Sequence, residues 1–131
     1  MENSLEFVGL IRLLDQCEGA TVVHAACSEF SFDMQLSISD AKTRLLVFYV
    51  AEASNFQLNV YAKYHPAELG VIANPDEALV YSFYVKNSDD IQDQICWLGS
   101  HFAWAMCKAG LIDFDEEARY CEIFGAEPKT R

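Results

Sequence analysis

The order of apolar and polar positions predicts helices at both ends of the chain and strands between them. Residues 4–16 repeat apolar side chains at helical spacing, which predicts a first helix. Residues 29–39, EFSFDMQLSIS, alternate between apolar and polar side chains, as in an antiparallel strand with one buried face that includes Phe30. Further strands are predicted at residues 21–27, 56–64 and 79–87.

The segment TRLLVFYVAE, residues 43–52, is apolar on both sides of the chain when it is drawn as a strand. This pattern predicts a central strand that is covered on each face or packed against a partner. The short stretches SDAK before it and ASN after it predict turns. Residues 65–78 contain two prolines and one glycine, which predict a long loop.

Two helices are predicted after the last strand, over residues 88–109 and 114–124. A glycine follows each of them, Gly110 and Gly125, where the left-handed conformation of glycine ends a helix readily. The predicted capping residues are Asn3 with Glu6 for the first helix, Ser88 for the second, and Asp113 with Glu116 for the third.

Together these elements predict a single α+β domain spanning residues 1–131. An antiparallel sheet of four to five strands forms a meander, and the N-terminal helix and the two C-terminal helices pack on one face of it. The longest unbroken apolar run is far shorter than the roughly 20 residues that cross a bilayer. Because MENSLEF has no basic region before an apolar stretch, we expect no signal peptide and a cytoplasmic location.

The chain is strongly acidic, with 20 Asp and Glu residues against 9 Lys and Arg residues and a formal net charge of −11. Such a surface repels nucleic-acid backbones and anionic membranes, so we expect neither as a direct partner. It attracts a basic protein or the basic groove of a protein complex. The alternative is that the acidity only keeps the protein soluble.

The sequence contains no pattern that specifies catalysis, a cofactor or a metal. Its glycines form no phosphate-binding loop, and no nucleophile elbow or zinc-protease motif occurs. The five cysteines form no C-x-x-C pair, and His24 and Cys27 lie three apart in a predicted strand, where they face opposite sides. We therefore expect no enzyme activity, no cofactor and no metal site, and we interpret the cysteines as free thiols.

The helix over residues 88–109 carries two apolar stripes on a helical wheel. The core stripe contains Ile91, Ile95, Leu98, Phe102 and Met106. The second stripe, roughly 120° away, contains Trp97, His101, Trp104 and Lys108. Cys96 and Cys107 point in a third direction, so this helix alone forms no Cys/His metal site. Either residues 114–124 cover the tryptophans, or the stripe stays exposed for a second copy or another partner.

Two other groups complete the candidate partner-binding surface. The outward face of the sheet is predicted to present two tyrosines among polar side chains, an arrangement that suits either binding or ordinary solvation. The acids at the starts of the last two helices suit either partner binding or stabilisation of the helix ends. The predicted partner-binding residues are Asp89, Asp90, Asp93, Trp97, His101, Trp104, Asp113, Asp115, Glu116, Glu117, Tyr61 and Tyr84.

These observations predict a small acidic intracellular inhibitor that binds a basic, nucleic-acid-processing partner and blocks it by phosphate mimicry. Toxin-neutralising immunity proteins and phage-encoded anti-CRISPR proteins are comparable small acidic α+β proteins. A dimeric acidic secretion chaperone is an alternative, although such chaperones have a central helix between strands, which the predicted order of elements lacks. A third alternative is a small-ligand-binding protein or enzyme with residues 64–77, including His65, as a lid.

Overall fold

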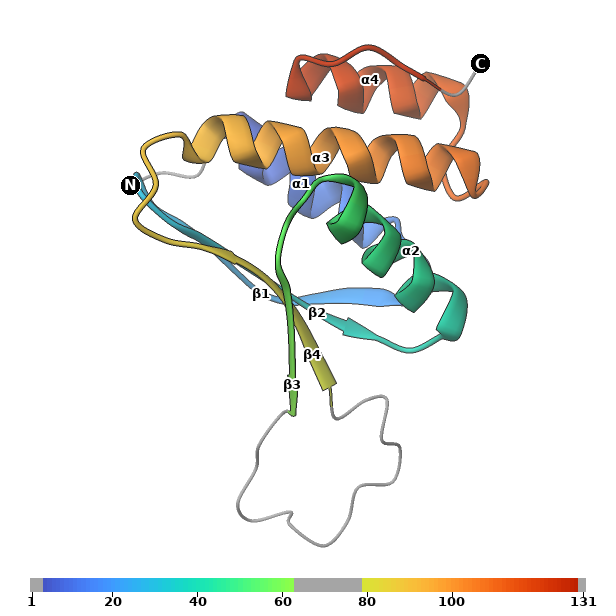
Figure 1. Cartoon of the computed structure of the whole chain (residues 1–131). Helices are drawn as coiled ribbons and strands as arrows, with labels where there is room; N and C mark the ends of the chain where they lie inside the picture. The colour runs from blue at the N-terminus through green and yellow to red at the C-terminus, as the bar shows by residue number, and fades with distance from the viewer. Residues whose placement is uncertain (1–3, 63–78, 130–131) are drawn as a thin grey trace, which may run out of the picture.

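The structure, a computed structural model, describes residues 4–62 and 79–129 and has the predicted α+β architecture. Four antiparallel strands form one sheet, and four helices gather on one side of it (Figure 1). In chain order the elements are α1 (Leu5–Asp15), β1 (Ala20–Cys27), β2 (Phe32–Ile38), α2 (Ala41–Ala53), β3 (Leu58–Ala62), β4 (Leu79–Val85), α3 (Ile91–Lys108) and α4 (Phe114–Phe124). Within the described residues, no helix has the length and apolar character needed to cross a bilayer.

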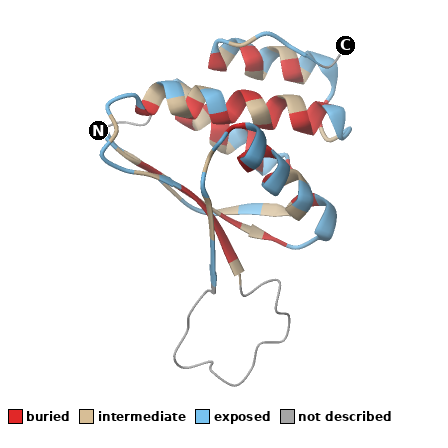
Figure 2. Ribbon diagram, in the orientation of Figure 1, coloured by how far each residue is buried: buried red, intermediate tan, exposed pale blue. Residues whose placement is uncertain are grey.

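Strand β2 lies inside the sheet and follows the predicted alternation. Its apolar side chains, Phe32, Met34, Leu36 and Ile38, are all buried, and the residues between them are half-buried on the opposite face. Phe30, predicted to belong to the same buried row, precedes the strand and is 53% exposed. The side chains of β2 that point toward the helices therefore belong to the core. Figure 2 shows buried residues both in the strands and in the helices.

The segment TRLLVFYVAE is helical, so the prediction of a central strand at residues 43–52 is wrong. It forms most of α2, which begins where the Asp40 carboxylate accepts a hydrogen bond from the Thr43 amide at 2.7 Å. The buried residues of α2, Thr43, Val47, Val50 and Ala51, recur at helical spacing. Aromatic and β-branched residues in a short apolar run suit either a strand or a helix, so periodicity alone does not decide between them.

Because α2 separates β2 from β3, the strands do not follow one another in the predicted meander. The order across the sheet is β1-β2-β4-β3, with Phe83 of β4 opposite Met34 of β2 on one side and Leu58 of β3 on the other. Helix α2 packs over β4, where Arg44 Nε donates a hydrogen bond to the Tyr81 hydroxyl at 2.9 Å. The helix thus covers part of β4 and leaves Val60 of the edge strand β3 42% exposed.

The ends of the last two helices agree with the sequence. The Asp113 carboxylate accepts a hydrogen bond from the Glu116 amide at 2.8 Å, which confirms the predicted cap of α4. Gly125 ends α4 with a left-handed φ of 71°, and Gly110 follows α3 with a φ of 78°. These glycines adopt a backbone conformation that other residues rarely adopt.

Two predicted helix caps need correction. The hydroxyl of Ser4 caps α1 by accepting a hydrogen bond from the Phe7 amide at 3.1 Å, and the predicted cap Asn3 lies outside the described residues. The N-cap of α3 is Asp90, without a side-chain capping bond, rather than Ser88. The Ser88 hydroxyl instead donates to the Asp90 carboxylate, so it stabilises the turn before the helix.

Helix α3 is the centre of the helical layer, and α4 lies outermost, on the far side of α3 from the sheet (Figure 1). The predicted core stripe of α3 is confirmed, because all five of its residues are buried. On the α4 side, the Phe124 ring fills the space that a side chain at Gly99 would occupy, only 2.5 Å from an added Cβ. The two helices are therefore in close contact where α3 has a glycine.

Candidate functional site

The second stripe of α3 places three aromatic rings in one row. The His101 ring lies edge-on between Trp97 and Trp104, with centroid distances of 4.5 Å and 5.0 Å. Within the described residues, His101 Nε2 is buried without a hydrogen-bond partner. Burial, and then the positive charge of Lys129, lower the pKa of His101. The three rings of the stripe are therefore uncharged near neutral pH.

The C-terminal tail, and not only α4, determines how far Trp104 is covered. The indole Nε1 of Trp104 donates a hydrogen bond to the Glu127 carbonyl at 2.9 Å, and Lys129 Nζ lies 3.9 Å from the centroid of the Trp104 ring. Trp104 is half-buried as a result. Both contacts hold the tail against this end of the stripe, and the second is a cation–π contact.

Trp97 is the open end of the stripe, since half of its surface is exposed. Its indole Nε1 donates a hydrogen bond to the Ser54 carbonyl at 2.9 Å, at the end of α2. The bond holds the ring at a fixed position against α2. The predicted cover is residues 114–124, but the hydrogen bond and the cation–π contact on Trp104 come from Glu127 and Lys129, beyond that helix. Trp97 remains half exposed.

A groove of about 590 Å³ opens beside Trp97, between the end of α2, the end of β4 and the first turns of α3. We call it the Trp97 groove. Its lining residues are Ser54, Asn55, Phe56, Gln57, Tyr84, Val85, Lys86, Gln94 and Trp97. Amide side chains, an indole and a tyrosine thus provide both hydrogen-bonding groups and apolar area, which is common in binding sites.

Three predicted acids lie at the start of α3, whose first turns contribute to the Trp97 groove, although none of them lines it. Asp89 and Asp90 precede α3, and Asp93 lies in its first turn, one helical turn before Trp97; all three are exposed. Gln94, which lines the groove, donates from Nε2 to the Asp90 carboxylate at 2.5 Å. Hydrogen bonds from Ser88 and then Gln94 lower the pKa of Asp90, so this carboxylate stays ionised.

The acids at the start of α4 belong to a separate surface. They follow the C-terminal end of α3, which lies about 22 Å along the helix from Asp93. Asp113 and Asp115 are exposed and Glu116 is half-buried, whereas Glu117 is 0% exposed. Within the described residues, neither carboxylate oxygen of Glu117 has a hydrogen-bond partner. Glu117 is therefore inaccessible to a partner in this structure.

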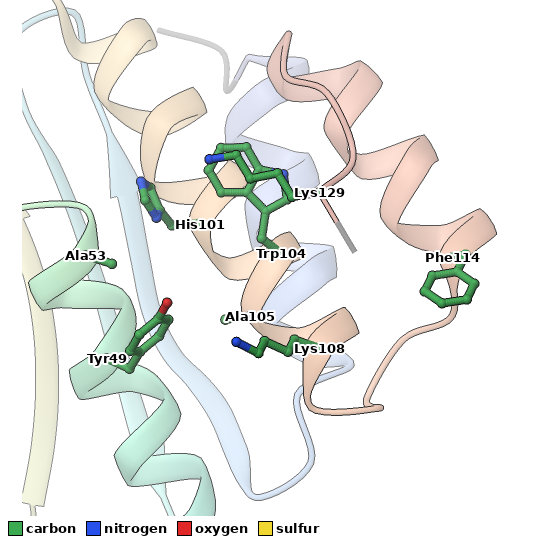
Figure 3. Close-up of a pocket in the computed structure, with 8 residues that line it drawn as sticks. All are labelled: Tyr49, Ala53, His101, Trp104, Ala105, Lys108, Phe114 and Lys129. Carbon is green, nitrogen blue, oxygen red and sulfur yellow. The ribbon is translucent and has the colours of Figure 1, made fainter. Parts of the chain in front are cut away.

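A second groove, of about 530 Å³, lies farther along α3 between α2 and α3. We call it the Lys108 groove. Figure 3 shows Tyr49 on α2 and Lys108 on α3 on opposite sides of it. Its lining residues are Tyr49, Ala53, His101, Trp104, Ala105, Lys108, Phe114 and Lys129, so no acid of the described chain lines it. The described lining of the Trp97 groove also contains no acid, and its one charged residue is Lys86. The two grooves therefore differ in the charges nearby, because the start of α3 with Asp90 and Asp93 adjoins only the Trp97 groove.

The two predicted tyrosines lie on the sheet face opposite the helices. The register of β3 and β4 places Tyr61 and Tyr84 on that face, and both are more than 40% exposed. At its centre Asp33 accepts hydrogen bonds from Ser82 at 3.0 Å and from Gln35 at 2.8 Å. Burial, and then Asp33, raise the pKa of Tyr61. Of the two tyrosines, only Tyr84 lines the Trp97 groove.

The cysteines have the environment of structural thiols. All five are free, and Cys17, Cys107 and Cys121 are buried. Burial raises the pKa of Cys17 to about 11, with Asp40 adding to the effect, and raises the pKa of Cys121 to about 11, with Glu117 adding to it. These two thiols are poor nucleophiles at neutral pH, because they remain protonated. In the described part of the chain, no three His, Cys, Asp or Glu side chains are placed to hold a metal ion.

The geometry therefore brings five of the predicted partner-binding residues together at one end of α3: Asp89, Asp90, Asp93, Trp97 and Tyr84. The sequence did not indicate that amide side chains complete the Trp97 groove, because Asn55 and Gln57 follow α2 whereas Gln94 lies on α3. The predicted lid, residues 64–77 with His65, lies outside the described residues.

Comparison with protein-family models, curated protein sequences and solved structures finds no match to this chain.

Proposed function

We propose that this protein is a cytoplasmic, non-catalytic binding protein that captures a basic segment of a protein partner in the Trp97 groove. The observation that carries the proposal is the position of half-exposed Trp97, held by Ser54 and one helical turn from Asp93. An indole face and nearby carboxylates are the two groups that attract an arginine or lysine side chain most strongly. The surrounding charge of −11 accelerates the encounter.

The proposed consequence of binding is inhibition of a nucleic-acid-processing partner. A basic segment that contacts phosphates cannot at the same time be held by Asp89, Asp90 and Asp93, because both bind the same cationic side chains. Asp93 lies in the first turn of α3, and Asp89 and Asp90 directly precede that turn, so three negative charges occur within five residues. The protein would therefore compete with nucleic acid for the partner.

A tryptophan-free peptide rich in arginine and lysine is a suitable probe, with an acidic peptide of equal length as the control. We expect calorimetric titration to detect binding of the basic peptide only, and Trp97→Ala to weaken it about three- to thirtyfold. In a second measurement, a labelled DNA duplex bound to the basic peptide should be released when the protein is added. Binding that Trp97→Ala leaves unchanged would contradict the proposed site.

Two matched double variants distinguish the effect of where the negative charges lie from the effect of the total charge. Asp89→Asn with Asp93→Asn removes two charges beside the Trp97 groove and leaves the N-cap Asp90 in place. Asp115→Asn with Glu122→Gln removes the same number of charges from exposed sites on α4. We expect only the first pair to weaken peptide binding. Equal weakening by both pairs would mean that the groove has no role beyond the overall charge.

A second candidate function, the dimeric secretion chaperone, gains support from α2. The sequence predicts an order of elements without a helix between strands, which counts against that class. Helix α2 lies between β2 and β3, so the objection no longer applies. This is a likeness in the order of elements alone, which indicates function only weakly. A chaperone of this kind should bind an unfolded apolar segment of a secreted protein, and failure to bind any such segment would contradict it.

A further inference from the structure

Helix α2 exposes large apolar side chains on the side that faces away from the core. Leu45 is 70% exposed, Phe48 is 43% exposed and Tyr49 is 59% exposed. The three residues lie within one turn of each other, on a face about 100° wide. Single exposed apolar residues are ordinary, but an adjacent group of three on one helix is typical of an interaction surface.

The apolar surface continues from α2 onto the edge strand β3. The Phe48 ring packs edge-on against Tyr81, with centroids 5.9 Å apart, and Val60 of β3 lies directly opposite Tyr81 in the sheet. Val60 points to the same side of the sheet as the core, yet it is 42% exposed. Helix α2 therefore leaves the edge of the sheet partly uncovered. We call Leu45, Phe48, Tyr49 and Val60 the α2 patch.

The charges on α2 fit a second copy of the same chain. Of the four described helices, α2 alone carries more bases than acids, namely Lys42 and Arg44 against Glu52. Two chains of charge −11 repel one another least where their contact surfaces are not acidic. In addition, exposed Lys42 and Glu52 lie at opposite ends of α2, on either side of the α2 patch.

We propose that the protein forms a two-fold symmetric homodimer in which the α2 helices of two copies pack antiparallel. In a two-fold contact, each pair of facing residues occurs twice. A centre at the level of residue 47 places Leu45 opposite Tyr49 and, at the same time, Lys42 opposite Glu52 of the other copy. The spacing of apolar and charged residues on this helix is thus complementary to itself. The dimer does not depend on the Trp97 groove having a ligand.

The size of α2 explains why β3 belongs to the contact. A helix of 13 residues is about 20 Å long, which by itself covers less than the roughly 800 Å² per partner of a typical stable interface. Val60 adds apolar area beside Phe48, so the α2 patch extends the contact beyond the helix. The interface therefore combines one face of α2 with the exposed part of β3.

Light scattering coupled to size-exclusion chromatography tests the proposal on the full chain without any ligand. From about 1 µM to about 100 µM we expect the mass to rise from monomer toward dimer. Leu45→Glu should raise the dimer dissociation constant at least about tenfold, because it places a charge at the centre of the contact. Its circular dichroism and unfolding should match the parent chain at low concentration, since Leu45 is largely exposed. A monomer throughout this range, or a dimer unaffected by Leu45→Glu, would overturn the proposal.

Exchange of the two charged residues distinguishes this contact from general repulsion. Glu52→Lys changes the net charge from −11 to −9, because one acid becomes one base, so reduced repulsion alone would strengthen dimerisation. The proposed pairing predicts the opposite: Glu52→Lys and Lys42→Glu should each weaken the dimer about three- to tenfold, and the double variant should restore it. Tighter association of Glu52→Lys than of the parent chain would contradict the pairing.

Discussion

The two sides of α3 differ in how closely their neighbouring helices approach. Toward α4, α3 presents Gly99, and the Phe124 ring fits directly over it. Toward α2, it presents the large rings of Trp97 and His101, and grooves lie on this side. The Trp104 ring lies between this side and the C-terminal tail. Since the separation of packed helices depends on the side chains between them, the same helix forms a closed contact on one side and an open one on the other. The α4 side accordingly contributes stability, and the α2 side offers surface for binding.

The largest decrease in stability is expected when the Phe124 ring, which packs between α3 and α4, is removed. Phe124→Ala removes a side chain that is only 5% exposed, and we expect it to lower the unfolding free energy by about 3–5 kcal/mol. Phe114→Ala, at the other end of the same helix, is the matched control, because Phe114 is 53% exposed. Urea unfolding followed by circular dichroism measures both. Similar losses for the two variants would contradict the difference in packing.

A methyl group added to the closed side should have the next largest effect. Gly99→Ala places a Cβ about 2.5 Å from the Phe124 ring, so α4 must shift, and we expect a loss of about 1–3 kcal/mol. Gly9→Ala is the control: its added Cβ would lie 3.1 Å from a methyl group of Ile123, which can move more easily. The same unfolding experiment should show the smaller loss for Gly9→Ala. A greater loss of stability for Gly9→Ala than for Gly99→Ala would contradict the close contact between Gly99 and the Phe124 ring.

The aromatic stripe should give the protein a pH-dependent stability. The pKa of His101 is lowered in the folded state, chiefly by burial, whereas the unfolded chain takes up a proton near the ordinary value of 6.5. Stability from neutral His101 is therefore present above pH 6.5 and is lost as the pH falls from there toward the folded-state pKa. His101→Phe keeps a ring in the stripe and should reduce the loss of stability between about pH 7 and about pH 5. An unchanged pH dependence in that variant would exclude His101 as its source.

The smallest change in stability is expected for a substitution on the exposed face of α2. Leu45→Ser replaces an exposed residue of α2, so at low protein concentration the unfolding free energy should change by no more than about 0.5 kcal/mol. Thermal unfolding of the dilute protein measures this. A loss comparable to that of Gly99→Ala would mean that Leu45 packs within the monomer.

Strand β2 and helix α3 show what could be predicted from the sequence. The alternation around Met34 and the wheel positions of Trp97 and His101 are local patterns, and local patterns are visible in one chain. Helix α2 was missed because its Val, Phe and Tyr residues suit a strand equally well, and its N-cap Asp40 also suits a turn. The error in that one segment changed the predicted strand order as well.

The candidate site was only partly predictable, because local patterns indicate neighbours on one helix but not contacts between distant parts of the chain. Trp97 and Asp93 lie on one helix, so their proximity follows from helical spacing. The groove beside them depends on Ser54, Asn55 and Gln57, whose positions are determined by the turn after α2. Contacts between residues far apart in the chain require the tertiary arrangement, which no local pattern encodes. The burial of Glu117 among otherwise accessible acids is a similar case.

The central claim is that Trp97 directly contacts a basic segment, and its fluorescence provides the most direct test. In a Trp104→Phe background, Trp97 is the remaining tryptophan and reports on the Trp97 groove alone. We predict that a tryptophan-free basic peptide shifts or quenches the Trp97 emission to saturation, and that Asp89→Asn with Asp93→Asn shifts the midpoint to higher peptide concentration. Binding detected by calorimetry in the same sample with no change in Trp97 emission would contradict the claim.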